Sequence, residues 1–317
     1  MYGTKIYFLA GGVDYPTRGN NTVFGFGALA LNINGEGNTA FGTNSMSQLI
    51  SGNENTSIGV NSMGKANNAG GNVSFGNNSM EGLGGYNENV AIGFMSFRRE
   101  FGQSSESVSY NTVIGSRALA YLRTGQNNIA IGYSSIKPIV SGDNNVSIGA
   151  NTGLNLITGN GNILIGNNTS TSSSNSNNEL NIGNWIYGKG GTIGIGTSNV
   201  NCSNCTGYKL FVKEGIKTEK IKVEFADMNG WADYVFEKDY PLMSIKEVKN
   251  FIEKNKHLPE VPTAEDVMKN GLELKEFNTL LLKKIEELTL HIIYLHEKLE
   301  EQNDKMDKLE KLEQKNK

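Results

Sequence analysis

The sequence predicts a mostly β protein with an α-helical C-terminus. A parallel β-roll or β-solenoid of 17-residue repeats is followed by a small α+β module and a C-terminal coiled coil. The prediction rests on a short phrase that recurs at fixed spacing, on glycines of which 35 of 39 precede residue 206, and on apolar heptads near the end of the chain. The expected segments are 1–19 (N-terminal segment), 20–200 (repeats), 201–230 (linker and short β connector), 231–271 (small helical module) and 272–317 (coiled coil).

The repeated phrase is Asn, a β-forming residue, a small residue, Phe or Ile, and Gly. Successive copies lie seventeen residues apart, except for one step of twenty-two between Gly93 and Gly115, and the degraded tenth copy has Glu179 in place of Asn. A coil of this length cannot bury its own apolar side chains, so the coils must stack on one another. The phrase glycines are Gly25, Gly42, Gly59, Gly76, Gly93, Gly115, Gly132, Gly149, Gly166 and Gly183.

Each position of the repeat has an expected role. Alternation along a strand places Val146 and Ile148 on one side and Ser147 on the other. We expect the bulky set to fill the coil interior and the small set to let another backbone approach. The small and large pair after each glycine, such as Ser45-Met46, predicts a second short strand. The glycine suits a corner with positive φ, and the repeated asparagines can stack amide on amide.

The phrases at residues 128–132 and 38–46 resemble the head repeats of trimeric autotransporter adhesins and related repeats in phage tail fibres. The resemblance covers roughly residues 20–183. It implies a homotrimeric, left-handed β-roll that presents a surface to receptors or host cells. Those adhesins end in a membrane-embedded β-barrel anchor, whereas this chain ends in a charged helix, which favours the fibre interpretation.

Between the repeats and the tail lies the only cysteine pair, Cys202 and Cys205. A single CxxC supplies half of a zinc site, and the βαβ context of a redox motif is missing. We expect a local or interchain disulfide or two free thiols, and zinc or redox chemistry remains the alternative. The connector at residues 208–223 predicts two short strands about Gly215.

Helix signals follow the connector. Ser244 with Glu247, and Thr263 with Asp266, have the spacing of capping boxes. The first predicts a helix to about Lys254. The second predicts a helix that ends at Gly271.

The last segment has apolar residues at alternating steps of three and four, which predicts a coiled coil. Isoleucine at a and leucine at d favour two chains, whereas the β-roll favours three; Asn278 at a and Gln302 at d weaken the heptad rule. Four residues add apolar surface outside the seam, which we expect to receive residues 231–268 of the same or an adjacent chain: Leu282, Leu290, Ile293 and Tyr294. The seam residues that we expect to drive trimerisation are Leu281, Ile285, Leu288, Ile292, Leu295 and Leu299.

Residues 231–236, 257–262 and 281–288 resemble the C-terminal region common in Bacteroidetes fibre-like and surface proteins. Their layout is similar to the endosialidase-type intramolecular chaperone, which trimerises fibres and cleaves itself with a Ser-Asp pair. No such pair follows the connector here, so self-cleavage is not expected.

Several function classes are disfavoured. A net charge of −3 with no basic cluster disfavours nucleic-acid binding, and no apolar window is long enough to insert into a membrane. The three histidines, His257, His291 and His296, do not form a metal-binding pattern, and no phosphate-loop motif occurs. We therefore expect no enzyme activity and no cofactor or metal.

The sequence thus predicts a homotrimeric fibre or adhesin-like protein that attaches to a glycan or protein receptor on a host surface. We expect it outside the cell or on the surface of a virion or injection particle. The rival hypotheses are a purely structural spacer and, third, a self-cleaving chaperone. The longer gap in the repeat predicts a recognition loop, whose structural alternative is a bulge without a ligand. Its candidate residues are Arg98, Arg99, Glu100, Phe101 and Tyr110.

Overall fold

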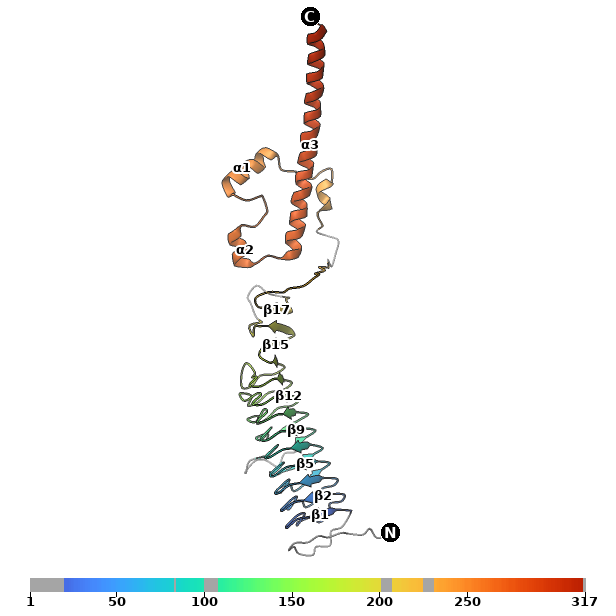
Figure 1. The fold of residues 1–317 in the computed structure, drawn as a ribbon, viewed down its shortest axis with the longest axis vertical. Coiled ribbons are helices and arrows are strands. Elements are labelled where there is room, and N and C mark those ends of the chain that lie inside the picture. Colours follow the sequence, from blue (N-terminus) through green and yellow to red (C-terminus); the bar gives the residue numbers. More distant parts are fainter. Residues whose placement is uncertain (1–19, 83, 100–107, 201–206, 225–230, 316–317) are drawn as a thin grey trace. The chain divides into compact units, whose positions relative to one another are not determined.

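The structure is a computed structural model that describes residues 20–82, 84–99, 108–200, 207–224 and 231–315. Its contacts divide the chain into two units, residues 1–217 and 218–317. The first is a parallel β-solenoid of about ten turns, and the second is helical and ends in one long helix (Figure 1). The predicted fold class is confirmed in these coarse features.

The main sheet of the solenoid takes one three-residue strand from each repeated phrase. Neighbouring strands are parallel and in register at the repeat spacing, so that Thr39 pairs with Thr56 and Ala40 with Ser57. Identical positions therefore lie directly above one another. The strands are β1 (Thr22–Phe24), β2 (Thr39–Phe41), β3 (Thr56–Ile58), β5 (Val73–Phe75), β7 (Val90–Ile92), β9 (Thr112–Ile114), β11 (Ile129–Ile131), β12 (Val146–Ile148), β13 (Ile163–Ile165) and β14 (Leu180–Ile182).

The main sheet ends in a short meander. β15 (Ile186–Lys189) and β16 (Thr192–Ile195) add to β14 in antiparallel fashion, and β17 (Leu210–Val212) is parallel to β16. The described residues after Gly215 contain no strand, so the prediction of a second strand there was wrong. A smaller parallel sheet consists of β4 (Ala69–Gly70), β6 (Tyr86–Asn87), β8 (Val108–Ser109) and β10 (Gly125–Gln126).

The small and large pair after each glycine is not a strand, which corrects the prediction. Met46 and Leu119 have φ values of 50° and 49° and lie in turns, and the second short strands occur just before the next phrase instead. The left-handed turn directs each large side chain into the coil. Both side chains are completely buried.

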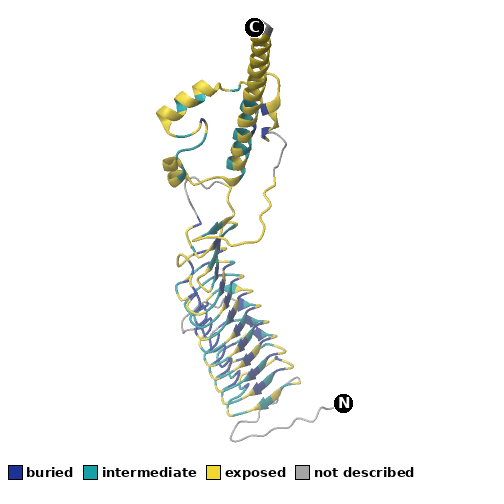
Figure 2. Ribbon diagram, turned by 45° about the horizontal axis from the view of Figure 1, so that its top comes forward, coloured by how far each residue is buried: buried dark blue, intermediate teal, exposed yellow. Residues whose placement is uncertain are grey.

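The expected inside and outside of the strands are also reversed. The small middle residues Ala40, Ser57 and Ser147 are buried, whereas Phe41 is half exposed and Ile148 is also exposed (Figure 2). The interior already holds the large side chain of most turns, so most coils have a small residue opposite it; Val113 and Leu164 are larger buried residues at this position. The bulky residues therefore point outward.

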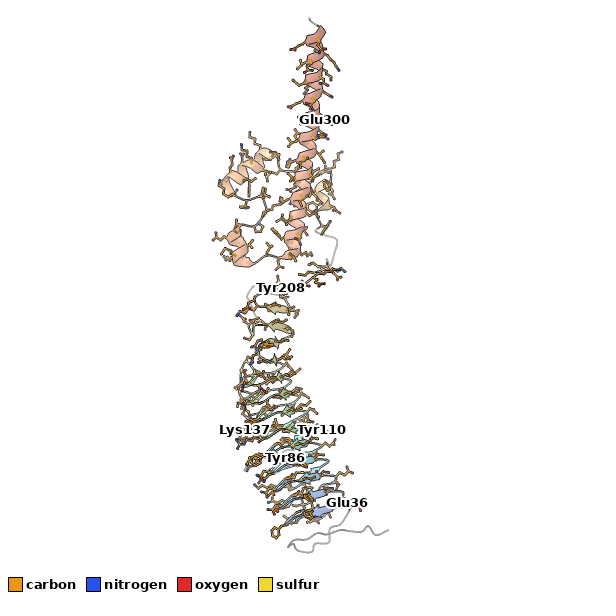
Figure 3. The ribbon with its side chains drawn as sticks, in the orientation of Figure 1. Glu36, Tyr86, Tyr110, Lys137, Tyr208 and Glu300 are labelled. Atoms are coloured by element: carbon orange, nitrogen blue, oxygen red, sulfur yellow. The ribbon has the colours of Figure 1, made fainter. Side chains whose placement is uncertain are left out.

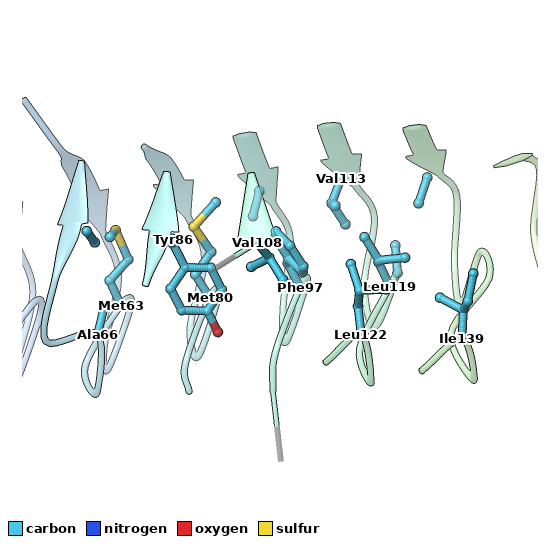
Figure 4. Close-up of a cluster of buried hydrophobic side chains, with 14 of the residues drawn as sticks. Met63, Ala66, Met80, Tyr86, Phe97, Val108, Val113, Leu119, Leu122 and Ile139 are labelled. Carbon is cyan, nitrogen blue, oxygen red and sulfur yellow. The ribbon is translucent and has the colours of Figure 1, made fainter. Parts of the chain in front are cut away.

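The interior of the solenoid is a continuous column of side chains (Figure 4). Met63, Met80 and Leu119 contribute one large apolar group from each coil. In the N-terminal coils the column also contains hydroxyls: Ser57 lies 2.9 Å from Ser45 and 2.8 Å from Ser62, measured between Oγ atoms. Buried polar groups of this kind are stable only when they are hydrogen-bonded.

The repeated asparagines form the predicted stack. Asn55 Nδ2 donates to Asn38 Oδ1 over 2.9 Å and to the Ala69 carbonyl over 2.7 Å, and Asn72 repeats the contact with Asn55. Each amide thus joins neighbouring coils. Because all three side chains are buried, these bonds also satisfy backbone groups that water cannot reach.

The phrase glycine stands at a corner that only glycine fits. Gly25 has φ of 134°, and a Cβ atom placed on it would lie 2.5 Å from the carbonyl carbon of Gly42 in the next coil. The expected positive φ is confirmed. Close stacking of the corners adds a second, steric reason for glycine at this position.

The second unit contains η1 (Ala232–Phe236), α1 (Ile245–Asn255), α2 (Ala264–Asn270) and α3 (Leu274–Lys315). Both predicted capping boxes are present, with Ser244 and Thr263 as the N-cap residues. η1 packs against α3, so the expected contact of this segment with the long helix occurs within one chain. Among the described residues, no helix has the length and apolar character needed to cross a membrane.

Candidate functional site

The outward face of the main sheet is an apolar surface. The first and third residues of each main-sheet strand from β1 to β14 point out of the coil; four of them are threonines, the others are apolar, and none of these strands contains a charged residue. The rings of Phe24 and Phe41 stack with their centroids 4.7 Å apart. The exposed apolar column at the third strand position includes Phe24, Phe41, Phe75, Ile92, Ile114 and Ile148.

A second exposed apolar surface runs along α3. The predicted seam residues Leu281, Ile285, Leu288, Ile292, Leu295 and Leu299 all lie on this helix and are 41–60% exposed. The chain's own η1 covers a different side of α3, where Glu286 is buried. The seam is therefore left open to solvent in a single chain.

The proposed recognition loop has a buried base. Arg99 is only 4% exposed; its Nη2 donates to the Arg123 carbonyl over 2.6 Å, and its guanidinium lies 5.7 Å from the centre of the Tyr86 ring. Arg98 Nε is 3.2 Å from Glu81 Oε2, and Lys65 contacts the same carboxylate at 2.8 Å. Both arginines thus anchor the insertion to the solenoid.

The other candidate residues of this loop are placed differently. Tyr110, labelled in Figure 3, is about half exposed, has φ of 60° and directly follows β8. Glu100 and Phe101 lie outside the described residues, as do Cys202 and Cys205. Of the five candidates, Tyr110 is the described residue that offers the most surface to a ligand.

Sequence reasoning missed the role of Glu81. This buried carboxylate bridges Lys65 in the preceding coil and Arg98 in the following coil. The signal was present, because Glu81 precedes Arg98 by one 17-residue repeat and therefore had to lie beside it in a stacked coil.

The last repeat contains a polar cluster that sequence reasoning also missed. Glu179 accepts hydrogen bonds from Ser172 N at 2.7 Å and from Lys189 Nζ at 2.6 Å, and Lys189 lies 3.1 Å from Ser172 Oγ. Burial alone would raise the pKa of Glu179, but the hydrogen bonds from Lys189 and Ser172 outweigh it and lower this pKa. The Lys189 ammonium donates to Glu179 and so cannot serve as a base for Ser172. A polar cleft of about 380 Å³ adjoins the cluster.

The described residues contain no group of His, Cys, Asp and Glu side chains that could hold a metal ion. In comparisons with known proteins, no family model, no curated protein and no solved structure matches this chain.

Proposed function

We propose that the chain is the subunit of a homotrimeric fibre, which uses its repeated β surface to attach to a glycan or protein receptor on a host surface. The observation that carries the proposal is the uncharged, largely apolar face that extends over the main-sheet strands from β1 to β14. Soluble monomers rarely expose apolar patches larger than a few hundred Å², and larger patches mark interaction sites.

A second copy of the chain is the partner that fits this face best. The outward residues recur at the 17-residue spacing of the coils, and an identical neighbour repeats at the same spacing. Burying each large apolar side chain contributes about 1.5–3 kcal/mol, so small contributions add up along the solenoid. The exposed seam of α3 offers a second contact to the same partner.

The resemblance to β-roll heads supports an assembly of three copies rather than two. The isoleucines at a and leucines at d favour two, but two polar residues, Asn278 and Gln302, interrupt this pattern. Three parallel chains would present each receptor-binding feature three times. Weak contacts would then gain through avidity.

Equilibrium sedimentation of the full chain tests the proposal. We expect a mass close to three times 34.4 kDa at micromolar concentration. A well-ordered monomer would contradict it, and a mass of two chains would correct the number of copies while leaving self-association in place.

A spacer without a receptor is the second candidate, because the anchoring of the insertion by Arg98 and Arg99 would serve a structural bulge as well as a ligand site. Replacing residues 100–107 with a Gly-Ser segment of equal length keeps these contacts intact. Lost binding to host cells by an intact trimer would support attachment. Unchanged binding would support the spacer.

Placement outside the cell or on a virion or injection particle forms part of the proposal, as does the absence of enzyme activity. The self-cleaving alternative predicts a shortened product. The intact mass of the expressed chain distinguishes them, since a fibre subunit without this activity keeps its full 34.4 kDa.

A further inference from the structure

The second unit contains an apolar groove of about 340 Å³ between α1 and α3. α1 has no buried residue, so the described residues of the chain leave its apolar face open. Figure 2 shows the same helix in the colours of exposed and half-buried residues. The groove is lined by Met243, Val248, Leu258, Lys284, Leu288 and His291, among others.

Polar contacts hold the wall of this groove in place. The Tyr240 hydroxyl donates a hydrogen bond to the Glu287 carboxylate. The Glu260 carboxylate accepts from Lys283 Nζ and Lys284 Nζ, each at 2.7 Å, and these bonds lower the pKa of Glu260. Tyr240 and Glu260, which line the groove on either side of α1 in the sequence, are thus both bonded to α3. These bonds fix the shape of the groove within the unit.

The groove and η1 lie on opposite sides of the helical seam. With Ile285 at a, the groove residues on α3 are Leu288 at d, Lys284 and His291 at g, and Glu287 and Lys283 at the next positions, c and f. Glu286, buried where η1 packs, occupies b, beside the e positions. Figure 1 shows η1, the short amber helix, on the other side of α3 from α1 and α2, and Figure 2, which is coloured by burial, shows the same arrangement from another angle.

In a parallel coiled coil, the g side of each helix meets the e side of its neighbour. The side that carries η1 also carries Trp231, Phe236 and Ile293, each about half exposed, and we name these three residues the η1 flank. We propose that the groove of one chain receives the η1 flank of a second copy. The inference rests on the proposed self-association and names the contact that it makes in the second unit.

This contact explains two surfaces at once. The apolar wall of the groove and the aromatic residues of the η1 flank are both left exposed by a single chain. An antiparallel pair would instead bring groove against groove, because g then meets g. The proposal therefore requires parallel chains, as the common direction of the solenoids in a fibre also does.

Photocrosslinking in the full chain tests the proposal. Met243 in the groove is replaced by p-benzoylphenylalanine, and a matched control carries the same residue in place of Met268, which lies on α2 outside the groove. We expect irradiation of the Met243 variant to give a two-chain product on a denaturing gel. Peptide mapping should locate the attachment at residues 231–236 or at Ile293 of the other chain, and not at the groove residues Glu287, Leu288 or His291. A further Phe236→Ala substitution should lower the yield about tenfold, as for a side chain central to an interface.

Sedimentation before irradiation separates the two proposals. Assembled chains that give only single-chain crosslinks, groove-to-groove products or as much two-chain product from the Met268 control would overturn this inference and leave self-association standing. A monomer in sedimentation would overturn the proposed function and, with it, this contact.

Discussion

Asn128 Nδ2 donates to Asn111 Oδ1 over 2.9 Å, and both side chains are buried between coils seventeen residues apart. Asn128 Oδ1 in turn accepts from Asn145 Nδ2 and from the Asn145 backbone N–H, each at 3.0 Å. One side chain therefore satisfies groups in the coils before and after it. The free energy of unfolding should depend strongly on every such residue.

Asn128→Ala is expected to lower the free energy of unfolding of the solenoid by about 2–3 kcal/mol, because buried donors and acceptors lose their partners. Thermal and chemical denaturation of the full chain, followed by circular dichroism, measures this loss. Asn34→Ala is the matched control, since Asn34 is exposed. Equal losses in the two variants would contradict a structural role of the asparagine stack.

The sequence allowed the coil length, the asparagine stack and the glycine corner to be predicted, because each repeats at one spacing. It did not allow the inside of the coil to be identified. Alternation separates Ser147 from Val146 and Ile148 but leaves open which side faces inward. That choice depends on Met46 and its equivalents, whose left-handed turns fill the interior first.

The contacts that anchor the insertion to the solenoid could not be predicted from the residue pattern either. The sequence predicted Arg98 and Arg99 as recognition residues, and arginine is seldom buried. In the structure Arg98 is half-buried beside Glu81, and Arg99 is buried and bonded to the Arg123 carbonyl. Stacking the sequence in rows of seventeen would have placed Glu81 beside Arg98, but the backbone acceptor of Arg99 has no sequence signal.

Gly132→Ala should destabilise the solenoid by about 3 kcal/mol or more, since a left-handed backbone strain of 1–3 kcal/mol is joined by a steric clash. Gly132 has φ of 127°, and an added Cβ would lie 2.4 Å from the carbonyl oxygen of Gly149. Gly190→Ala is the control: its φ is 58°, and no atom lies within 4 Å of its added Cβ. Comparable denaturation midpoints for the two variants would show that the corners can separate at little cost.

Phe75→Thr should weaken self-association and leave the single coil intact, because Phe75 points outward while its strand partners remain unchanged. The lost burial of about 1.5–3 kcal/mol per interface should appear as a higher dissociation concentration in sedimentation.

Ala91→Leu tests the inward side of the same sheet, because Ala91 is completely buried. Overpacking there should cost about 1–3 kcal/mol of coil stability. The reverse pattern would show that the bulky residues face inward after all.

Glu286→Gln should stabilise the second unit near neutral pH. Burial, and then the nearby charge of Asp233, raises the pKa of Glu286 above its ordinary value, and its Oε2 has no hydrogen-bond partner among the described residues. The folded state therefore binds the proton more tightly than the unfolded chain. The stability that this proton contributes is fully present below the unfolded pKa and is lost as the pH rises through the folded pKa.

Removing the carboxylate should abolish this part of the pH dependence. We expect thermal unfolding of the helical signal in the full chain to occur at a higher temperature for Glu286→Gln at pH 7, with the difference shrinking toward pH 4. Glu297→Gln, on an exposed position of α3, is the control and should match the unmodified chain at both values. A Glu286→Gln variant that melts at a lower temperature at pH 7 would mean that the carboxylate stabilises the contact with η1, because its charge would then have to be compensated in the folded state.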